Sequence, residues 1–374
     1  MSLREVGWLI FLVGLPFAHL LFKPLDPWHG QAVWAQGWIT VLFALSLGLG
    51  GRVKGNRPLG ALVAWIGFIT LSVWVKTILV QKVYPVPMLQ GVMHLVLLLF
   101  AYYAAVTVWN GPFLIKLTRW MAYAGVVILG YCVLQLLNLD QFFKPIDVTS
   151  TDVLVGTIGN TTHLSTHLAL LLPLFLLQPK RIWWLWSGIT IALITYSGSL
   201  GGQVAALGVL VWWAWHKSKH IFFGVCALGT LGVLWVVFHS ALLNPHGRLM
   251  AWGRFYEMFA RQPITGIGPG YVMEASRLIT NGSAPMFGWR HVHNEYFQMA
   301  IEYGIIGLGL VGWMMWEIVC LVKRLPRSPL VVALSAVLIA FGLNSLVNFP
   351  SHLWVLGSYA LMAYCGLQVL GEPV

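Results

Sequence analysis

The sequence predicts an all-α protein that crosses a membrane about twelve times. Composition is the first observation behind this prediction: 59% of the 374 residues are hydrophobic and only 9% are charged, against roughly 25% charged in an ordinary soluble domain. The second is that apolar runs of about twenty residues recur along the whole chain, which is the length a helix needs to cross a bilayer. We therefore expect a single integral membrane domain over residues 1–374.

The apolar runs place the membrane spans in order along the chain. They cover residues 6–22, 32–50, 59–80, 87–109, 120–139, 163–177, 182–198, 201–216, 221–239, 302–322, 330–347 and 352–370. Several runs between 163 and 216 are short, so a re-entrant or broken helix could lie there. Arg4 precedes the first run, as in a signal peptide, but no small-residue cleavage site follows, so we interpret this run as a membrane anchor.

The positions of lysine and arginine predict that both termini face the cytoplasm, since basic residues favour the cytoplasmic side of short loops. With the N-terminus inside, the cytoplasmic segments hold Arg4, Arg52, Lys54, Arg57, Lys116, Arg119, Lys180, Arg181, Lys217, Lys219, Lys323, Arg324 and Arg327. The short outer loops hold only Lys23, Lys82 and Lys144. The net charge of +11 thus reflects membrane topology, and because the basic residues form no continuous face it does not indicate nucleic acid.

Cysteine and tryptophan do not indicate a separate site. The cysteines lie singly in predicted spans, so we interpret them as small apolar residues rather than disulfides or metal ligands: Cys132, Cys226, Cys320 and Cys365. The 20 tryptophans could form a sugar-stacking surface, but pairs such as Trp183-Trp184 lie near span ends, as in an interfacial belt. Glycines within the spans favour close helix packing.

Residues 240–301, between predicted spans 9 and 10, form one long outer loop of different composition. Its arginines are Arg248, Arg254, Arg261, Arg277 and Arg290. A long loop can cross the membrane despite such charge, so the cluster needs another explanation. The planar fork of arginine suits phosphate oxygens, which suggests an anionic ligand.

Within this loop we expect a short amphipathic helix over about 247–261, in which Arg248 and Trp252 are one turn apart. Gln262-Pro263 should end the helix. The Gly266-Ile267-Gly268-Pro269-Gly270 turn that follows could be an ordinary loop, or its backbone amides could approach an anion.

His293-Asn294 and Gly304-Ile305-Ile306-Gly307, nine residues apart, stand where this loop re-enters the membrane. Polar groups at that depth are costly unless they find partners, so they form a candidate site. A helical gap of this length spans roughly 14–15 Å, which places His293 near the outer mouth and the glycines deeper. His291 could be a second acid–base group or could shape the loop, and Glu302 could pair with an arginine or remain a plain interfacial carboxylate.

Polar residues elsewhere have simpler explanations. His163 and His167, one turn apart, have the spacing of metal ligands, but no third ligand accompanies them, so capping or headgroup contact is favoured. Asn160 is a candidate helix cap. Lys76 and His94 lie within spans, where snorkelling or internal pairing accounts for them. No metal site and no cofactor is predicted.

The loop residues resemble the superfamily of O-antigen ligases and O-antigen polymerases, which also includes the O-oligosaccharyltransferases that modify pilins. Arg248, Trp252, Pro263 and the glycine turn match its loop pattern, and His293-Asn294 with Gly304 and Gly307 matches the ligase pattern. The segment GTIGNTTHLSTHLALLLPL (156–174) is similar to the family's glycine–asparagine segment entering a span. The resemblance covers roughly residues 150–350.

The resemblance implies a metal-independent, inverting glycosyltransferase of the bacterial inner membrane. Its donor would be a glycan on undecaprenyl pyrophosphate, used at the periplasmic face, and its acceptor a hydroxyl of lipid A–core, of a growing glycan or of a protein. By the family pattern His293 is the catalytic histidine, as a general base or an orienting group, and Arg248 stabilises the leaving pyrophosphate. The histidine motif favours a ligase of lipopolysaccharide biosynthesis over a polymerase or a protein O-oligosaccharyltransferase.

One position departs from the family pattern. The family carries a Ser-Arg pair near the outer end of a middle span, and here Leu200 follows Ser199 where arginine is expected. Arg254 and Arg290 could replace the missing charge, and Gln203 could supply a neutral hydrogen bond. The predicted substrate-binding residues are Arg254, Arg290, Asn294, His291, Gly268 and Gln203.

A transporter or flippase for an anionic solute, with the arginine loop as an outer gate, is the alternative from another class. Such a protein should place ionisable groups and broken helices at the bilayer midplane. Here the charges gather in one external loop and the spans are nearly uncharged, so the sequence favours the transferase.

Overall fold

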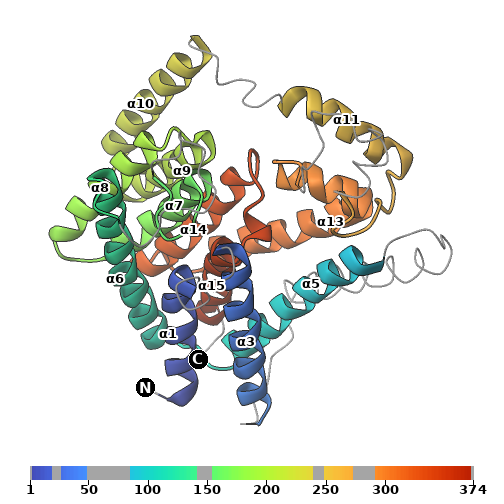
Figure 1. Cartoon of the computed structure of the whole chain (residues 1–374). Coiled ribbons are helices and arrows are strands. Elements are labelled where there is room, and N and C mark those ends of the chain that lie inside the picture. The colour runs from blue at the N-terminus through green and yellow to red at the C-terminus, as the bar shows by residue number, and fades with distance from the viewer. Residues whose placement is uncertain are drawn as a thin grey trace.

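The computed structural model describes residues 2–18, 27–48, 85–140, 154–238, 248–272 and 291–371 (Figure 1). All regular structure in these ranges is helical. The helices are α1 (Leu3–Gly14), η1 (Leu15–Phe17), α3 (Pro27–Gly48), α5 (Pro85–Val106), α6 (Gly111–Leu136), α7 (Thr161–Leu177), α8 (Ile182–Tyr196), α9 (Leu200–Lys217), α10 (Lys219–Phe238), α11 (Arg248–Arg261), α13 (Glu295–Arg324), α14 (Pro329–Asn344), η3 (Pro350–His352) and α15 (Trp354–Gly371).

The all-helical prediction is confirmed for the described residues. Every predicted span within them coincides with a helix, and the predicted span 59–80 lies outside them. Among the described residues, three helices are long and apolar enough to cross a membrane, namely α6, α13 and α15, and shorter apolar helices include α7, α8 and α14. The chain is thus a multi-pass membrane protein by length and composition, while the number of twelve spans and their orientation remain predictions.

Polar side chains fix where the helices begin. The side chain of Asn160 accepts the amide of His163 at the start of α7, which confirms the predicted cap. Asn294 accepts the amide of Phe297 in the same way at the start of α13. Cap residues such as these satisfy amides that the first turn of a helix leaves unpaired.

Helix α7 lies at the centre of the bundle, between α6, α8, α9 and α14 (Figure 1). Glycines of α9 allow its close approach to two neighbours. A Cβ on Gly202 would lie 1.8 Å from Ser165 Oγ of α7, and one on Gly201 would lie 2.7 Å from Asn344 Nδ2 of α14. Asn344 Nδ2 in turn donates to Thr166 Oγ1 at 2.9 Å. The glycines thus let the backbone of α9 approach the side chains of α7 and α14 closely, as expected for membrane helix bundles.

A break in a helix occurs in α13 and not between residues 163 and 216. Gly304 has φ 66° and ψ −167° inside α13, whereas α7, α8 and α9 are separate unbroken helices. α13 also begins at Glu295, before the predicted span start at residue 302. The first turns of α13 meet the C-terminal end of α14, where the Glu295 amide donates to the Ser345 carbonyl at 2.8 Å.

Candidate functional site

His293 occupies a strained position just before α13. Its φ is 56°, a left-handed conformation that residues with a side chain rarely adopt. Both neighbours are held. The Val292 amide donates to Gln298 Oε1 at 3.1 Å, and the Val292 carbonyl accepts Trp252 Nε1 at 2.8 Å. Asn294 caps α13. These hydrogen bonds hold the strained backbone and so fix the position from which the His293 side chain projects.

Phe349 lies among three histidines from distant parts of the chain. Its ring stacks on His291 with centroids 4.3 Å apart, and meets His293 and His163 edge-on at 4.9 and 5.3 Å. His163 is only 4% exposed and His167, against Tyr359, is fully buried. The expected headgroup contact for these two histidines is therefore wrong. His163 contributes to the same cluster as the His293 motif.

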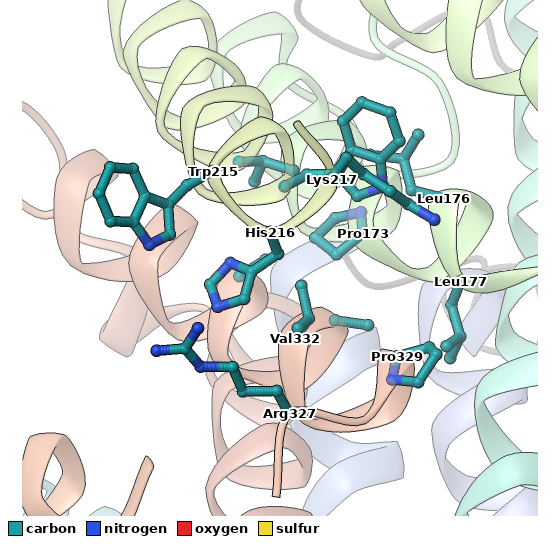
Figure 2. Close-up of a pocket in the computed structure, with 13 residues that line it drawn as sticks. Pro173, Leu176, Leu177, Trp215, His216, Lys217, Arg327, Pro329 and Val332 are labelled. Carbon is teal, nitrogen blue, oxygen red and sulfur yellow. The ribbon is translucent and has the colours of Figure 1, made fainter. Parts of the chain in front are cut away.

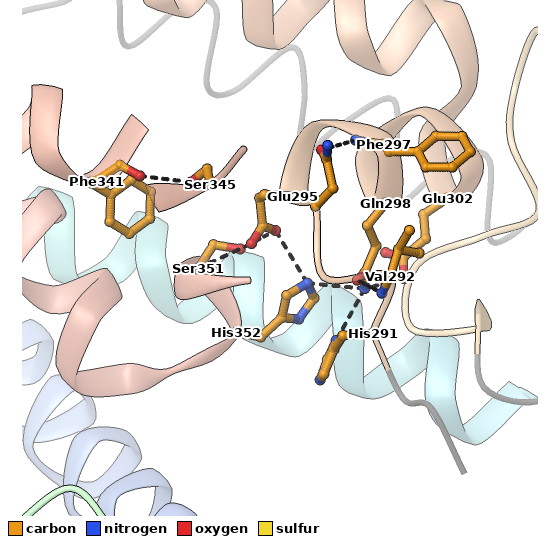
Figure 3. A network of polar contacts seen from close by, with 11 residues as sticks. His291, Val292, Glu295, Phe297, Gln298, Glu302, Phe341, Ser345, Ser351 and His352 are labelled. Atoms are coloured by element: carbon orange, nitrogen blue, oxygen red, sulfur yellow. Dashed lines mark hydrogen bonds and ion pairs between the residues drawn. The ribbon is translucent and has the colours of Figure 1, made fainter. Parts of the chain in front are cut away.

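Glu295 and His352 form an ion pair (Figure 3), and the ring of His352 lies next to that of His291, with centroids 4.3 Å apart. Glu295 is 2% exposed, and its carboxylate accepts both the hydroxyl and the backbone amide of Ser351. Burial disfavours a charge on His352, but the attraction of Glu295 and its hydrogen bond prevail and raise the pKa of His352 above 6.5. The pair joins the start of α13 to η3.

Gln298 connects the ion pair to His291 and Glu302. Its Nε2 lies 3.2 Å from His291 Nδ1, 2.9 Å from Glu302 Oε1 and 3.1 Å from His352 Nε2 (Figure 3). An amide NH₂ has two hydrogens for these three neighbours. Because His352 Nε2 donates to Glu295 when it is protonated, the two hydrogens of Gln298 go to His291 Nδ1 and Glu302 Oε1. His291 then carries its own proton on Nε2.

His291 is a neutral imidazole in this arrangement. Burial, followed by the nearby His352, lowers the pKa of His291 well below 6.5. The cluster therefore holds two imidazoles of opposite character, since the pKa of His291 is lowered by burial and that of His352 is raised by Glu295. Such divergence is typical of sites where protons are handled.

The arginine helix is attached to the His293 loop. The predicted helix over 247–261 is confirmed as α11, and its residues Ala251, Phe255 and Met258 are buried with Val292. Trp252 adds the hydrogen bond to the Val292 carbonyl. Arg248 and Trp252 of the sequence pattern are thus one turn apart on a helix that packs against the residue before His293.

The glycine turn fills the break in α13. Gly266, Gly268 and Gly270 have φ of 66°, 115° and 69°, as the predicted turn requires. The amides of Ile267 and Gly268 donate to the carbonyls of Ile301 and Glu302 at 2.8 and 3.0 Å. The amide of Gly268, expected to approach an anion, therefore has a partner within the protein.

The other side of the break is paired in the same way. The amides of Ile305 and Ile306 donate to the carbonyls of Pro263 and Ile264 at 2.8 and 3.3 Å. A Cβ on Gly304 would lie 2.2 Å from the Ile264 carbonyl oxygen, and one on Gly307 would lie 2.1 Å from the Tyr303 Cβ. Both glycines of the G-x-x-G motif are thus required by packing.

The structure describes only some of the arginines that were predicted to bind the substrate. Arg254 lies on an exposed face of α11 and pairs with Glu257 at 3.3 Å. Arg248 begins α11, and Arg277 and Arg290 lie outside the described residues. Gln203 lies in the first turn of α9, with Nε2 3.5 Å from the Thr195 carbonyl. The structure therefore brings together His291, His293 and Asn294 of the predicted set, and gives Arg254 and Gln203 other neighbours.

Sequence reasoning missed several residues of the cluster: Glu295, Gln298, Phe349, Ser351 and His352. One signal was present, since polar residues at 295, 298 and 302 recur with helical spacing at the start of an apolar helix. His94, for which internal pairing was one prediction, contacts the Trp354 ring in a tilted arrangement, with centroids 4.3 Å apart. In the described part of the chain, no group of three histidine, cysteine or acidic side chains could hold a metal ion.

Comparison with known proteins adds a family to this geometry. Residues 145–312 match the family model described as O-antigen ligase. The match includes α7, α11 and the first part of α13, and thus the His293 motif, and it ends before η3. No curated protein matches the chain.

Proposed function

We propose that this chain, whose residues 145–312 form a domain of the O-antigen ligase family, transfers a glycan from undecaprenyl pyrophosphate to an acceptor hydroxyl. The family consists of glycan-transferring enzymes of the bacterial inner membrane, which implies a lipid-linked donor and a separate acceptor. We choose lipid A–core as the acceptor because His293-Asn294 with Gly304 and Gly307 matches the ligase pattern. The site would face the periplasm, as the distribution of basic residues predicts.

The anchoring of His293 is the observation that carries this proposal. Trp252, Gln298 and Asn294 hold the residues on either side of it, so the imidazole projects from a backbone that is fixed at a cost of about 1–3 kcal/mol. Backbone strain that the surrounding structure holds in place clusters at active sites and ligand clamps. α11, which Arg248 begins, packs against the same loop.

The proposed reaction is one inverting displacement. His293 takes the proton of the acceptor hydroxyl while its oxygen forms a bond to the anomeric carbon. The bond from that carbon to the pyrophosphate oxygen breaks, and its electron pair leaves with the lipid pyrophosphate. Arg248 stabilises the charge that develops on the leaving group. No metal enters the step.

Glu295, Gln298 and His352 act in this proposal as positioning residues. Gln298 bonds the Val292 amide on one side and His291 on the other, and the Glu295–His352 pair joins α13 to η3. Together they set the loop that carries His293 against Phe349. We assign them no direct contact with the substrate.

The test is transfer by the purified protein from undecaprenyl-pyrophosphate glycan to lipid A–core, to free glycan or to protein. His293→Ala and Arg248→Ala should each lose transfer by at least about 100-fold. His220→Ala and Arg119→Ala, at exposed positions in α10 and α6, are the matched controls and should keep it. Full transfer by both site variants would refute the catalytic roles of His293 and Arg248. Loss of transfer when a chelator removes metal ions would refute the metal-independent mechanism.

A further inference from the structure

The end of the bundle opposite the His293 cluster has a pocket with basic side chains in its lining. A pocket of about 210 Å³ opens where α7 and α9 end and α14 begins (Figure 2). Its polar lining is basic: His216 and Lys217 from the last turn of α9, and Arg327 from the segment before α14. In Figure 2 His216 and Arg327 point into the same region of the pocket.

This pocket is remote from the His293 cluster. It is lined by Pro329 at the first turn of α14, whereas the far end of α14 is followed by Ser345, whose carbonyl accepts the Glu295 amide. The 16 residues of α14 rise about 24 Å between these points. The pocket is therefore no part of the site proposed for glycan transfer, and it lies at the end that the sequence predicts to be cytoplasmic.

The walls and the aromatic residues of the pocket suit a lipid. Pro173 and Leu176 of α7 and Val332 and Ala336 of α14 supply apolar surface. Trp215, at the rim, is 58% exposed, as tryptophans at the level of lipid headgroups are.

The frame of the pocket is fixed by hydrogen bonds between α9 and α14. Trp212 Nε1 donates to the Val332 carbonyl at 3.2 Å and to Ser335 Oγ at 2.9 Å. His216 Nδ1 lies 2.8 Å from the Trp212 carbonyl, so this nitrogen donates and the ring is held at the pocket. These contacts hold α9 and α14 together beside the cations.

The cations of the pocket lack acidic partners in the described residues. The ion pairs found there involve Arg254 and His352, and Lys217 instead lies over the Trp213 ring, with Nζ 5.7 Å from its centroid. Two basic side chains beside one apolar pocket thus have charge available for an anion. A pocket of about 210 Å³ has room for a headgroup phosphate.

We propose that this pocket binds the phosphate of an anionic glycerophospholipid, with Arg327 on the phosphate, Lys217 adding positive charge at the pocket and the acyl chains along the apolar helix surfaces. Basic pockets between membrane helices recognise lipid headgroups in this way. Bound lipid would bridge α9 and the α13–α14 connection. The proposal stands apart from glycan transfer, because none of its residues belongs to the His293 cluster.

Native mass spectrometry of the full-length protein, titrated with phosphatidylglycerol or with zwitterionic phosphatidylcholine, tests the proposal. Lys217→Gln/Arg327→Gln removes both cations. Lys323→Gln/Arg324→Gln is the matched control, since these exposed residues at the end of α13 do not line the pocket. Glycerol 3-phosphate and inorganic phosphate are added as competitors without acyl chains.

We expect the wild type to bind phosphatidylglycerol over phosphatidylcholine, and the pocket variant to lose affinity for it by on the order of 30-fold. The control variant should lose little. Equal losses in the two variants would show unspecific surface attraction and overturn the proposal. Complete competition by inorganic phosphate would identify a site for soluble phosphate and would also overturn it.

Discussion

Glu295 Oε1 and His352 Nε2 lie 3.3 Å apart, and this pair joins the first turn of α13 to η3. The Glu295 side chain is 3% exposed and that of His352 is 28% exposed, so the charge of the carboxylate depends on its partners inside the protein. The contact draws the last two helices of the chain toward the loop that carries His293. It is one of several long-range contacts that hold the site, beside those of Trp252 with Val292 and of Gln298 with His352.

The two residues should be energetically coupled. His352→Gln leaves a buried carboxylate without its cation, and Glu295→Gln removes the charge that His352 faces. In a double-mutant cycle on the free energy of unfolding, we expect a coupling of about 1–3 kcal/mol, with the double variant more stable than the sum of single losses implies. Additive losses would show that the pair contributes no interaction of its own.

The stability from this pair should fall as pH rises. The folded-state pKa of His352 is raised above 6.5, so its stabilising charge is fully present below pH 6.5 and is lost as pH rises through the folded value. The wild type should melt at a higher temperature than Glu295→Gln, and this difference in melting temperature should become smaller as the pH rises above 6.5. A difference that grows with pH would contradict the assignment of charge to His352.

Gly304 should tolerate no side chain. Gly304→Ala places a Cβ 2.2 Å from the Ile264 carbonyl oxygen and keeps a φ of 66°, so we expect a loss of about 2–4 kcal/mol in the free energy of unfolding. Gly312→Ala is the control in the same helix, since nothing lies within 4 Å of its Cβ. It should be neutral or stabilising by up to about 1 kcal/mol. Equal melting temperatures for the two variants would disprove the packing role.

Trp252 should affect glycan transfer indirectly, by holding His293 in position. Trp252→Phe keeps most of the buried ring but removes the donor to the Val292 carbonyl, at a cost of about 1 kcal/mol in stability. Because that bond holds the residue before His293, transfer should fall about tenfold. Trp313→Phe loses a comparable bond to Glu317 at an exposed position and should change neither quantity. Unchanged transfer in Trp252→Phe would show that the hydrogen bond from α11 is not needed to position His293.

Local signals in the sequence predicted the helices. α11 spans Arg248–Arg261 against a prediction of 247–261, because its amphipathic pattern and Pro263 act over a few residues. α13 begins earlier than expected, since Glu295, Gln298 and Glu302 look like loop residues in the sequence. They are in fact buried on a helix whose polar partners lie elsewhere in the chain.

The candidate site was predictable only in part for the same reason. His291, His293 and Asn294 are adjacent in a recognisable motif, whereas the contact of Gln298 with His352 joins residues 54 positions apart. Such a contact depends on how α14 and α15 return to the start of α13. The family match, too, ends before His352.

The break at Gly304 has a consequence for how the protein is assembled. An α-helix in lipid must pair its own backbone, and here two rungs, between residues 301 and 305 and between 302 and 306, are paired instead by residues 263–268. Until that segment has docked, α13 is an incomplete membrane helix. We therefore expect completion of the span to require docking of residues 263–268. Substitutions in residues 263–268 should thus lower the amount of protein in the membrane, through degradation by membrane quality control, rather than give a stable but inactive enzyme.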